Sequence, residues 1–184
     1  MSSYLSSAKK QFAYYKLLGE KVIQRLNENQ IHWQPNEDTN SIALLVKHMT
    51  GNMKSRFTNF LTEDGEKTWR KRDTEFENTI KSKSHLLETW EAGWRVVFDA
   101  VNPLEEKQLE DLIYIRNEGH TIIEALNRQL NHYAYHVGQM VFIGKQLLGD
   151  TWESLSIPKG QSEVFFQEKM AQKKGKRHFT DDIK

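Results

Sequence analysis

The chain has 184 residues, which is enough for a single domain with a substantial core. Its 26 Lys and Arg residues nearly balance its 25 Asp and Glu residues, so the formal net charge is +1. This balance argues against a protein built chiefly to bind nucleic acid, which would carry a clustered excess of basic residues. The sequence contains no cysteine, so a metal ion would have to be bound by His, Asp, Glu or water.

Neither a membrane span nor a targeting segment is visible in the sequence. No stretch approaches the ~18 consecutive apolar residues of a transmembrane helix. Residues 1–10 lack the basic-then-apolar order of a signal peptide. We therefore expect a soluble cytoplasmic protein in which residues 1–184 form one domain.

Apolar residues recur at helical spacing through most of the chain, and only three prolines occur, so the sequence predicts a mostly helical protein. The first helix is expected from about Ser3 to Asn27. A loop rich in turn-forming residues follows it. The second helix is expected to begin near Asn40 or Ser41, either of which could cap it, and to continue to about Phe60.

Residues 62–77 are highly charged and show little periodicity, which predicts a long loop anchored by Trp69 and Phe76. Long ordered loops in compact domains are often functional, although anchoring alone would explain the two aromatic residues equally well. A third helix is expected over about residues 84–100. The Asn-Pro pair at positions 102 and 103 should end it.

Alternating β-branched residues around a glycine-containing turn predict a short hairpin or an extended link near Ile113. The segment Thr121-Ile122-Ile123-Glu124 has the form of a capping box and should open a fourth helix. This helix should run to about Leu148, with Gly149 in the usual stop position. An irregular tail is expected from about residue 150. The four long helices together predict an all-α four-helix bundle with long loops.

Two histidines of the fourth predicted helix, His132 and His136, are four residues apart and would lie on one face, one turn from each other. Two imidazoles in this arrangement can bind a single divalent cation. On a helical wheel both fall within the apolar stripe, and His48 falls on the apolar face of the second helix. All three should therefore point into one core. The spacing is only moderately specific, because it lacks the glutamate of the His-Glu-x-x-His motif.

A single histidine on an apolar face is more often a satisfied core or interface residue than a metal ligand. Three inward histidines are harder to explain in that way, because each buried imidazole without a partner costs a few kcal/mol and a shared metal would satisfy all three. Three neutral imidazoles with an open fourth position would suit a catalytic metal site. Of the other histidines, His32 and His178 should be solvated, His85 should be a surface residue, and His120 should be either near the site mouth or merely exposed.

The histidine at position 48 and the pattern His-x-x-x-His-x-Gly-Gln at 132–139 resemble the DinB/YfiT-like superfamily, whose members are regarded as metal-dependent enzymes. Four local strings are more particular and resemble a bacterial subgroup of unknown function within it. They occupy residues 48–52, 64–67, 127–139 and 154–162. The resemblance spans about Tyr4 to Glu168.

The resemblance implies a four-helix bundle in up-down-down-up order that is frequently a homodimer. It also implies a three-histidine site, at His48, His132 and His136, that binds zinc, nickel or a related ion. Relatives in the superfamily include transferases and isomerases that use low-molecular-weight thiols such as mycothiol, bacillithiol or glutathione. Membership does not by itself fix an activity.

Two functions remain open on the sequence. In the first, the protein is a metal-dependent enzyme, a thiol-dependent transferase or a hydrolase, in which the metal activates a bound water or thiol toward a small-molecule substrate. Asn52 and Gln129, one turn from the ligands, and Gln139, at the edge of that face, are candidates to line the site. Tyr135 points away from the apolar stripe and is left out. No catalytic residue beyond the metal ligands is predicted.

In the second, the protein is a non-catalytic metal-binding or metal-stabilised dimeric bundle that acts through a partner. Carboxylates near the metal would favour hydrolysis, whereas a fully coordinated metal without an open cavity would favour a structural role. Neither function involves nucleic acid or a membrane. The aromatic residues Trp69, Trp94 and Trp152 are candidates for a homodimer interface.

Overall fold

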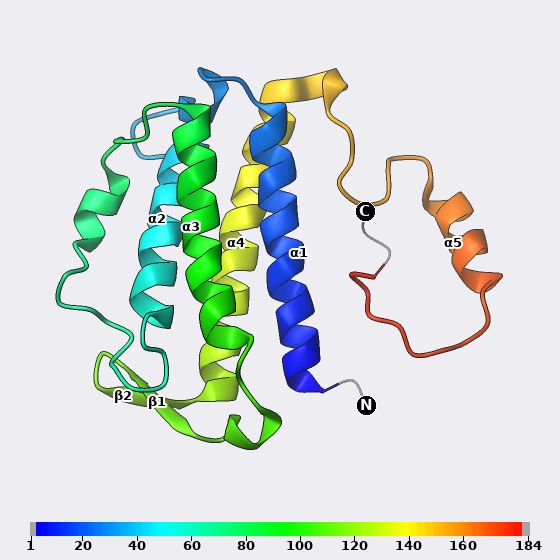
Figure 1. The fold of residues 1–184 in the computed structure, drawn as a ribbon. Helices are drawn as coiled ribbons and strands as arrows, with labels where there is room; N and C mark the ends of the chain where they lie inside the picture. The colour runs from blue at the N-terminus through cyan, green and yellow to red at the C-terminus, as the bar shows by residue number, and fades with distance from the viewer. Residues whose placement is uncertain (1–2, 182–184) are drawn as a thin grey trace.

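The computed structural model describes residues 3–181, and in this part of the chain most residues lie in helices. The long helices lie side by side (Figure 1): α1 (Tyr4–Arg25), α2 (Ile42–Phe57), α3 (Lys83–Val101) and α4 (Ile122–Leu148). An antiparallel hairpin precedes α4 and consists of β1 (Leu112–Ile115) and β2 (Glu118–Thr121). A shorter helix, α5 (Ser162–Met170), follows in the C-terminal segment. The predicted all-α class is confirmed in that the fold is mostly helical.

The helices pack in pairs that run in the same direction. Figure 1 shows α1 and α4 running upward and α2 and α3 running downward. Helix α1 contacts α4 and helix α2 contacts α3, while further contacts join α1 to α3 and α2 to α4. Contact between α2 and α4 brings together the three candidate histidines, which these two helices carry.

Each long helix begins where the side chain of a Ser or Thr accepts a hydrogen bond from a backbone N–H three residues later; the caps are Ser3, Ser41, Ser82 and Thr121. Ser41 is one of the two caps predicted for the second helix. Thr121 and Glu124 form the predicted capping box. Helix α4 ends at Gly149, whose φ of 53° suits glycine. The first helix ends at Arg25, two residues earlier than predicted.

The core between the helices is rich in aromatic rings, and its largest fully buried side chains include Phe12, Trp90, Trp94 and Tyr133. The Trp94 ring lies 5.4 Å from the Tyr133 ring in an edge-to-face arrangement. Trp94 is therefore unavailable to a second subunit, and its prediction as an interface residue is wrong. Trp152 is half-buried, with the Arg25 guanidinium 5.2 Å above its ring.

The charged segment 62–77, predicted to be a loop, contains one short 3-10 turn, η2 (Arg72–Phe76). Phe76 is half-buried and its ring stacks on His48 at 5.0 Å between centroids, so it anchors the segment as predicted. Trp69 is 55% exposed, and its prediction as the second anchor is wrong. The segment therefore docks on α2 beside a candidate ligand.

Two further contacts fasten this segment. Lys47 on α2 donates a hydrogen bond to the backbone oxygen of Glu77 at 2.7 Å. Asp64 accepts hydrogen bonds from the backbone N–H groups of Arg116 and Asn117, both at 2.8 Å. These two residues form the turn of the hairpin and have positive φ, and the carboxylate stabilises that turn. Of the two alternatives predicted near residue 113, a short hairpin or an extended link, the hairpin is the one present.

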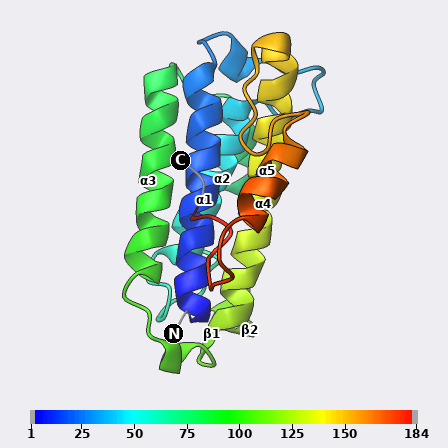
Figure 2. The ribbon, with the colours of Figure 1, turned by 90° about the vertical axis from the view of Figure 1, so that its right-hand side faces the viewer.

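The C-terminal segment returns along α1 (Figure 2). The Ser7 hydroxyl lies 2.9 Å from His178 Nε2, and Lys10 forms an ion pair with Asp181. The tail predicted to be irregular from about residue 150 thus contains α5, of which no residue is buried. Within residues 3–181, none of the helices is both long enough and apolar enough to cross a membrane.

Candidate metal centre

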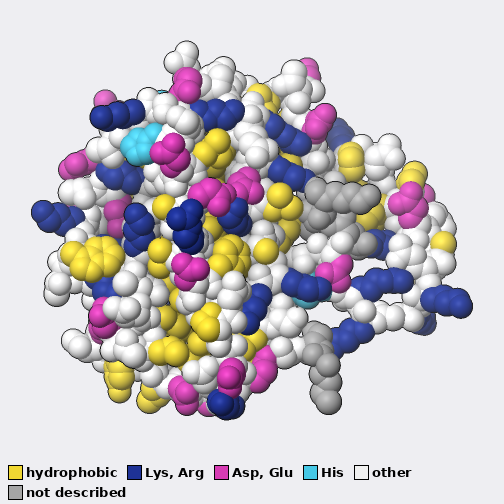
Figure 3. All heavy atoms as spheres, viewed as in Figure 1, with side chains coloured by type: hydrophobic (Ala, Val, Ile, Leu, Met, Phe, Trp, Pro, Cys, Tyr) yellow, Lys and Arg dark blue, Asp and Glu magenta, His cyan; other side chains and the backbone are white. Residues whose placement is uncertain are grey.

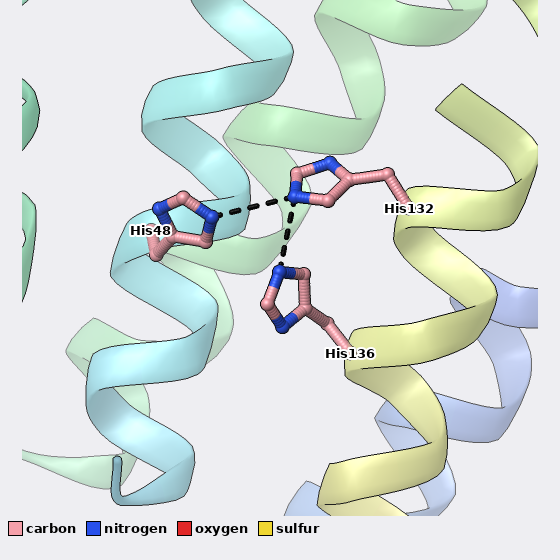
Figure 4. Close-up of side chains that lie close together, drawn as sticks. All are labelled: His48, His132 and His136. Atoms are coloured by element: carbon pink, nitrogen blue, oxygen red, sulfur yellow. Dashed lines mark hydrogen bonds between the residues drawn. The ribbon is translucent and has the colours of Figure 1, made fainter. Parts of the chain in front are cut away.

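His48 projects from α2 toward His132 and His136, which project from consecutive turns of α4 (Figure 4). The Nε2 atom of His132 lies 3.4 Å from that of His48 and 3.0 Å from that of His136. Tetrahedral coordination with Zn–N bonds of about 2.0–2.1 Å places ligand nitrogens about 3.4 Å apart. The three histidines are thus close enough together to hold one metal ion.

The hydrogen bonds behind the rings determine where the imidazole protons lie. His48 Nδ1 is 2.9 Å from Glu75 Oε2, and His136 Nδ1 is 2.8 Å from Gln139 Oε1. Each Nδ1 must carry the ring proton to donate to an oxygen, so the Nε2 atoms of His48 and His136 keep a lone pair. His132 Nε2 can donate one proton at most, so it can form a hydrogen bond with only one of these two lone pairs. A cation would accept all three lone pairs, so the donor set fits a metal that prefers imidazole.

Glu75 holds His48 in its orientation. Its side chain is only 8% exposed and also accepts hydrogen bonds from Nε and Nη2 of Arg70, at 2.8 and 3.0 Å. Burial would raise the pKa of Glu75, but the hydrogen bonds from His48 and Arg70, and the charge of Arg70, hold that pKa below its ordinary value. An ionised carboxylate behind a metal-binding imidazole fixes the ring and makes Nε2 a better ligand.

Glu75 can approach His48 because residue 51 has no side chain. Gly51 lies in the interior of α2 directly against the carboxylate, and a Cβ at this position would collide with it. A helix with glycine at an interior position is less stable than one with alanine there by about 0.5–1 kcal/mol. The close approach of η2 to α2 accounts for a glycine at this position.

The rings of His132 and His136 are neutral in the folded protein. Burial, with smaller effects of the neighbouring His136 and His48, lowers the pKa of His132 to about 3. Burial also lowers the pKa of His136, although its hydrogen bond with Gln139 acts in the opposite direction. Both imidazoles are therefore unprotonated at pH 7, which is the form that binds a metal.

The cluster opens into a pocket of about 440 Å³ that receives residues from α2, from the 62–77 segment, from the hairpin and from α4. The predicted lining residues Asn52, Gln129 and Gln139 all border this pocket. Asn52 Oδ1 accepts a hydrogen bond from the Tyr133 hydroxyl at 3.2 Å. Tyr135 is 64% exposed and borders the pocket too, so the prediction that it lies outside the site is wrong.

Comparison with known proteins supplies a family. A family model described as "Protein of unknown function (DUF1572)" matches residues 1–161. The chain belongs to this family. The matched region contains helices α1 to α4, the hairpin and the histidine cluster, and it ends before α5. No curated protein and no solved structure gave a significant match.

In this DUF1572 protein, Glu75 and Arg70 are site residues that the sequence did not predict. Both lie in the aperiodic 62–77 segment, where no helical face indicates which side chains point inward. One general signal was available, because a metal-binding histidine usually donates its second N–H to a carboxylate or carbonyl. That rule directs attention to the acidic residues of the segment without choosing among them.

The remaining histidines lie outside the cluster, and all four are half-buried: His32, His85, His120 and His178. His178 and His32, predicted to be solvated, are partly exposed, and each also contacts another side chain: His178 contacts Ser7, and His32 Nδ1 lies 3.0 Å from the Asn78 amide. His120 Nε2 lies 3.4 Å from Arg128 Nη1, and Arg128 borders the pocket. Of the two positions predicted for His120, the one near the site mouth therefore applies.

Proposed function

We propose that this protein is a metal-dependent enzyme in which His48, His132 and His136 bind one divalent ion, zinc or nickel. One observation carries the proposal: the three Nε2 atoms converge beside an open pocket, so a further coordination position would be accessible to water or a substrate. A structural zinc site is normally closed by a fourth protein ligand. The alternative, a non-catalytic metal-stabilised bundle that acts through a partner, gives the pocket no role.

We further infer a four-helix bundle of the DinB/YfiT-like superfamily, with the helices in up-down-down-up order. The shared direction of α1 and α4, opposite to that of α2 and α3, supports this order (Figure 1). The position of one ligand on α2 and of two ligands one turn apart on α4 supports the superfamily.

A bound divalent ion would supply Lewis acidity and would lower the pKa of a water or thiol placed on it. Residues of the chain would hold the metal-binding rings in place and orient the substrate. Glu75 and Gln139 hold the rings of His48 and His136 with their Nε2 atoms toward the pocket. Asn52 and Gln129 present side-chain amides to the pocket and would orient the substrate.

Between the two enzyme classes, the pocket favours group transfer over hydrolysis. None of the residues that border it in the described part of the chain is Asp or Glu. Glu75, the carboxylate that contacts His48, has both oxygens engaged by His48 and Arg70, so it is poorly suited to accept a proton from water. A metal-bound thiolate needs no such base once it has formed, which is why we propose a thiol-dependent transferase first and a hydrolase second.

Metal titration of the untagged protein tests the binding step. We expect the wild type to bind one zinc or nickel ion, and His132→Ala and His136→Ala to lose at least about 100-fold in affinity while remaining folded. His120→Ala, which removes a half-buried histidine outside the cluster, is the matched control and should bind as the wild type does. Unchanged affinity in both cluster variants would disprove the site.

Turnover assays test the catalytic step. The metal-loaded protein should accelerate the reaction of electrophiles with low-molecular-weight thiols, and the chelator-treated protein should not. A protein that binds the metal tightly, gains stability from it and accelerates neither thiol transfer nor hydrolysis would support the non-catalytic alternative instead.

A further inference from the structure

The pocket beside the histidine cluster has a strongly positive lining. Its border includes the following arginines and no acidic residue in the part of the chain that the structure describes: Arg56, Arg70, Arg72, Arg116 and Arg128. On the face drawn in Figure 3 the charges are mixed, and Lys and Arg side chains are interspersed with Asp and Glu. Five of the eight arginines of the chain border this pocket, although the net charge of the chain is only +1.

Two carboxylates neutralise part of this charge. Arg70 forms a bidentate pair with Glu75. Arg56 and Arg116 share Glu66, with nitrogen–oxygen distances of 3.2 and 2.8 Å. Three arginines are thus paired with two carboxylates, and the lining keeps an excess of positive charge.

A third carboxylate, Asp64, lies near this group and does not remove the excess. Its oxygens accept hydrogen bonds from the backbone N–H groups of Glu66, Arg116 and Asn117. Even with Asp64 included, the five arginines outnumber the carboxylates around them.

Of the five arginines that border the pocket, Arg72 and Arg128 are the two whose charges are unpaired. Among residues 3–181, neither forms an ion pair with a carboxylate. The Arg72 guanidinium lies 5.4 Å above the Phe76 ring, and Arg128 lies beside His120. Arg72 belongs to η2 and Arg128 to α4, so the two charges come from separate walls of the pocket.

Two buried residues that border the pocket each have a side-chain polar atom without a partner. Arg56 is 5% exposed and its Nε has no hydrogen-bond acceptor, and Gln129 is 3% exposed and its Oε1 has no donor. Buried polar groups are normally satisfied. A ligand in the pocket could supply an acceptor for Arg56, and an anionic oxygen is the acceptor that a guanidinium binds most strongly.

We propose that the pocket binds a small anionic substrate whose carboxylate or phosphate oxygens are held by Arg72 and Arg128, with Arg56 as a deeper donor. This inference rests on the proposed metal site, because it places the neutral or reacting end of the substrate at the three histidines. The pocket volume of about 440 Å³ lies in the range of small-molecule sites. The metal ion would add to the positive potential of the pocket and would increase its preference for anions.

Calorimetric titration of the zinc-loaded protein tests the proposal. The probes are succinate and inorganic phosphate, with butane-1,4-diol as the neutral control and 1,4-diaminobutane as the cationic control. We expect at least one anion to bind, more weakly as sodium chloride is added, and neither control to bind. The better of the two anions identifies the substrate headgroup as a carboxylate or a phosphate.

Substitution of the unpaired arginines locates the binding. The double variant Arg72→Gln/Arg128→Gln should weaken anion binding by about tenfold or more, because it removes both unpaired charges and the charge-assisted hydrogen bonds that they would form with the anion. Arg95→Gln, an exposed arginine on α3 outside the pocket, is the matched control and should change the affinity by no more than about twofold. Equal affinity of the double variant and the wild type, or equal binding of the diol, would overturn the proposal.

The zinc affinity of the same variants separates the two proposals. Arg72 and Arg128 contact none of the three histidines by hydrogen bond, so the double variant should bind zinc as tightly as the wild type. A wild type that binds neither zinc nor nickel would overturn the proposed function, and the anion titration of the metal-free protein would then test the anion site on its own. A wild type that binds zinc but neither anion would overturn only the anionic substrate.

Discussion

Glu75 is the residue on which the orientation of His48 depends. It accepts the Nδ1 proton of that ring, and Arg70 fixes it in turn through two hydrogen bonds. The three residues form a chain of contacts that ends at the Nε2 atom facing the pocket. Removal of a partner of this kind commonly weakens metal binding by 10–100-fold.

Glu75→Gln should therefore weaken zinc binding by about 10-fold to 100-fold without unfolding the protein. The amide oxygen could still accept from His48, but the negative charge that favours a metal-binding ring would be absent. Competition with a chelating dye measures the affinity. Glu77→Gln is the control, because Glu77 is exposed and its contacts with Lys47 and Thr74 are made by its backbone oxygen and its backbone N–H. A Glu75→Gln protein with wild-type affinity would show that Glu75 is not part of the site.

The low pKa of His132 has a consequence for the stability of the metal-free protein. In the unfolded chain this histidine titrates near pH 6.5, whereas in the folded protein burial lowers its pKa to about 3. Between these values the unfolded state binds the proton and the folded state does not. The contribution of His132 to the free energy of unfolding is thus fully present above about pH 6.5 and is lost as the pH falls toward 3.

Urea unfolding of metal-free protein at a series of pH values measures this effect. The free energy of unfolding should decrease from pH 7.5 to pH 5 in the wild type, and it should decrease less steeply in His132→Gln, which has no proton to bind. Identical pH dependence in the two proteins would contradict the burial of a neutral His132.

At the scale of elements, the helices could be predicted because local chemistry and periodicity agree. Ser41 and Thr121 cap α2 and α4 where the sequence places caps, and Gly149 ends α4. The helical wheel also predicted that His48, His132 and His136 point to one place, since each falls on the apolar face of its helix. A period of 3.6 residues carries that information directly.

The connection between α2 and α3 could not be predicted in the same way. Its residues have no period, so nothing local indicated that Glu75 is buried against α2 while Trp69 is exposed. Helix α5 escaped prediction for a related reason, because none of its residues is buried and its sequence shows no apolar face. Tertiary contacts, and not local pattern, decide both segments.

Gly51 gives a test of how η2 docks on α2. Gly51→Ala should weaken zinc binding and lower the denaturation midpoint, because the new methyl group would displace the Glu75 carboxylate from His48. Gly138→Ala on α4 is the matched control: a methyl group added there would meet no atom within 4 Å, so the change should raise stability by about 0.5–1 kcal/mol. Equal behaviour of the two variants would rule out the close approach of Glu75 to α2.

At the scale of the whole molecule, composition concealed the most distinctive electrostatic feature. A net charge of +1 gave no sign that arginines from α2, the 62–77 segment, the hairpin and α4 meet at one pocket. Residues distant in sequence come together only through the tertiary fold. Composition therefore carried no information about the charge of the pocket or about the anionic substrate that we propose for it.

Association into a homodimer remains a proposal. Trp94 cannot contribute to an interface, but large apolar side chains such as Trp69, Tyr135 and Phe142 are 55%, 64% and 63% exposed and are available. Light scattering of the purified protein should give the mass of two chains, and Phe142→Glu should shift the mass toward one chain if α4 forms the interface. A wild type of monomer mass at working concentrations would contradict the dimer.

The central claim is that three imidazoles hold one metal ion with a position left open to the pocket. X-ray absorption spectroscopy of the untagged zinc-loaded protein tests it most directly, because it counts imidazole ligands and measures their bond lengths. We expect three imidazole nitrogens at about 2.0–2.1 Å and one further oxygen or nitrogen ligand, and one imidazole fewer in His132→Ala. A zinc shell with fewer than three imidazoles in the wild type, or a shell unchanged in His132→Ala, would contradict the account.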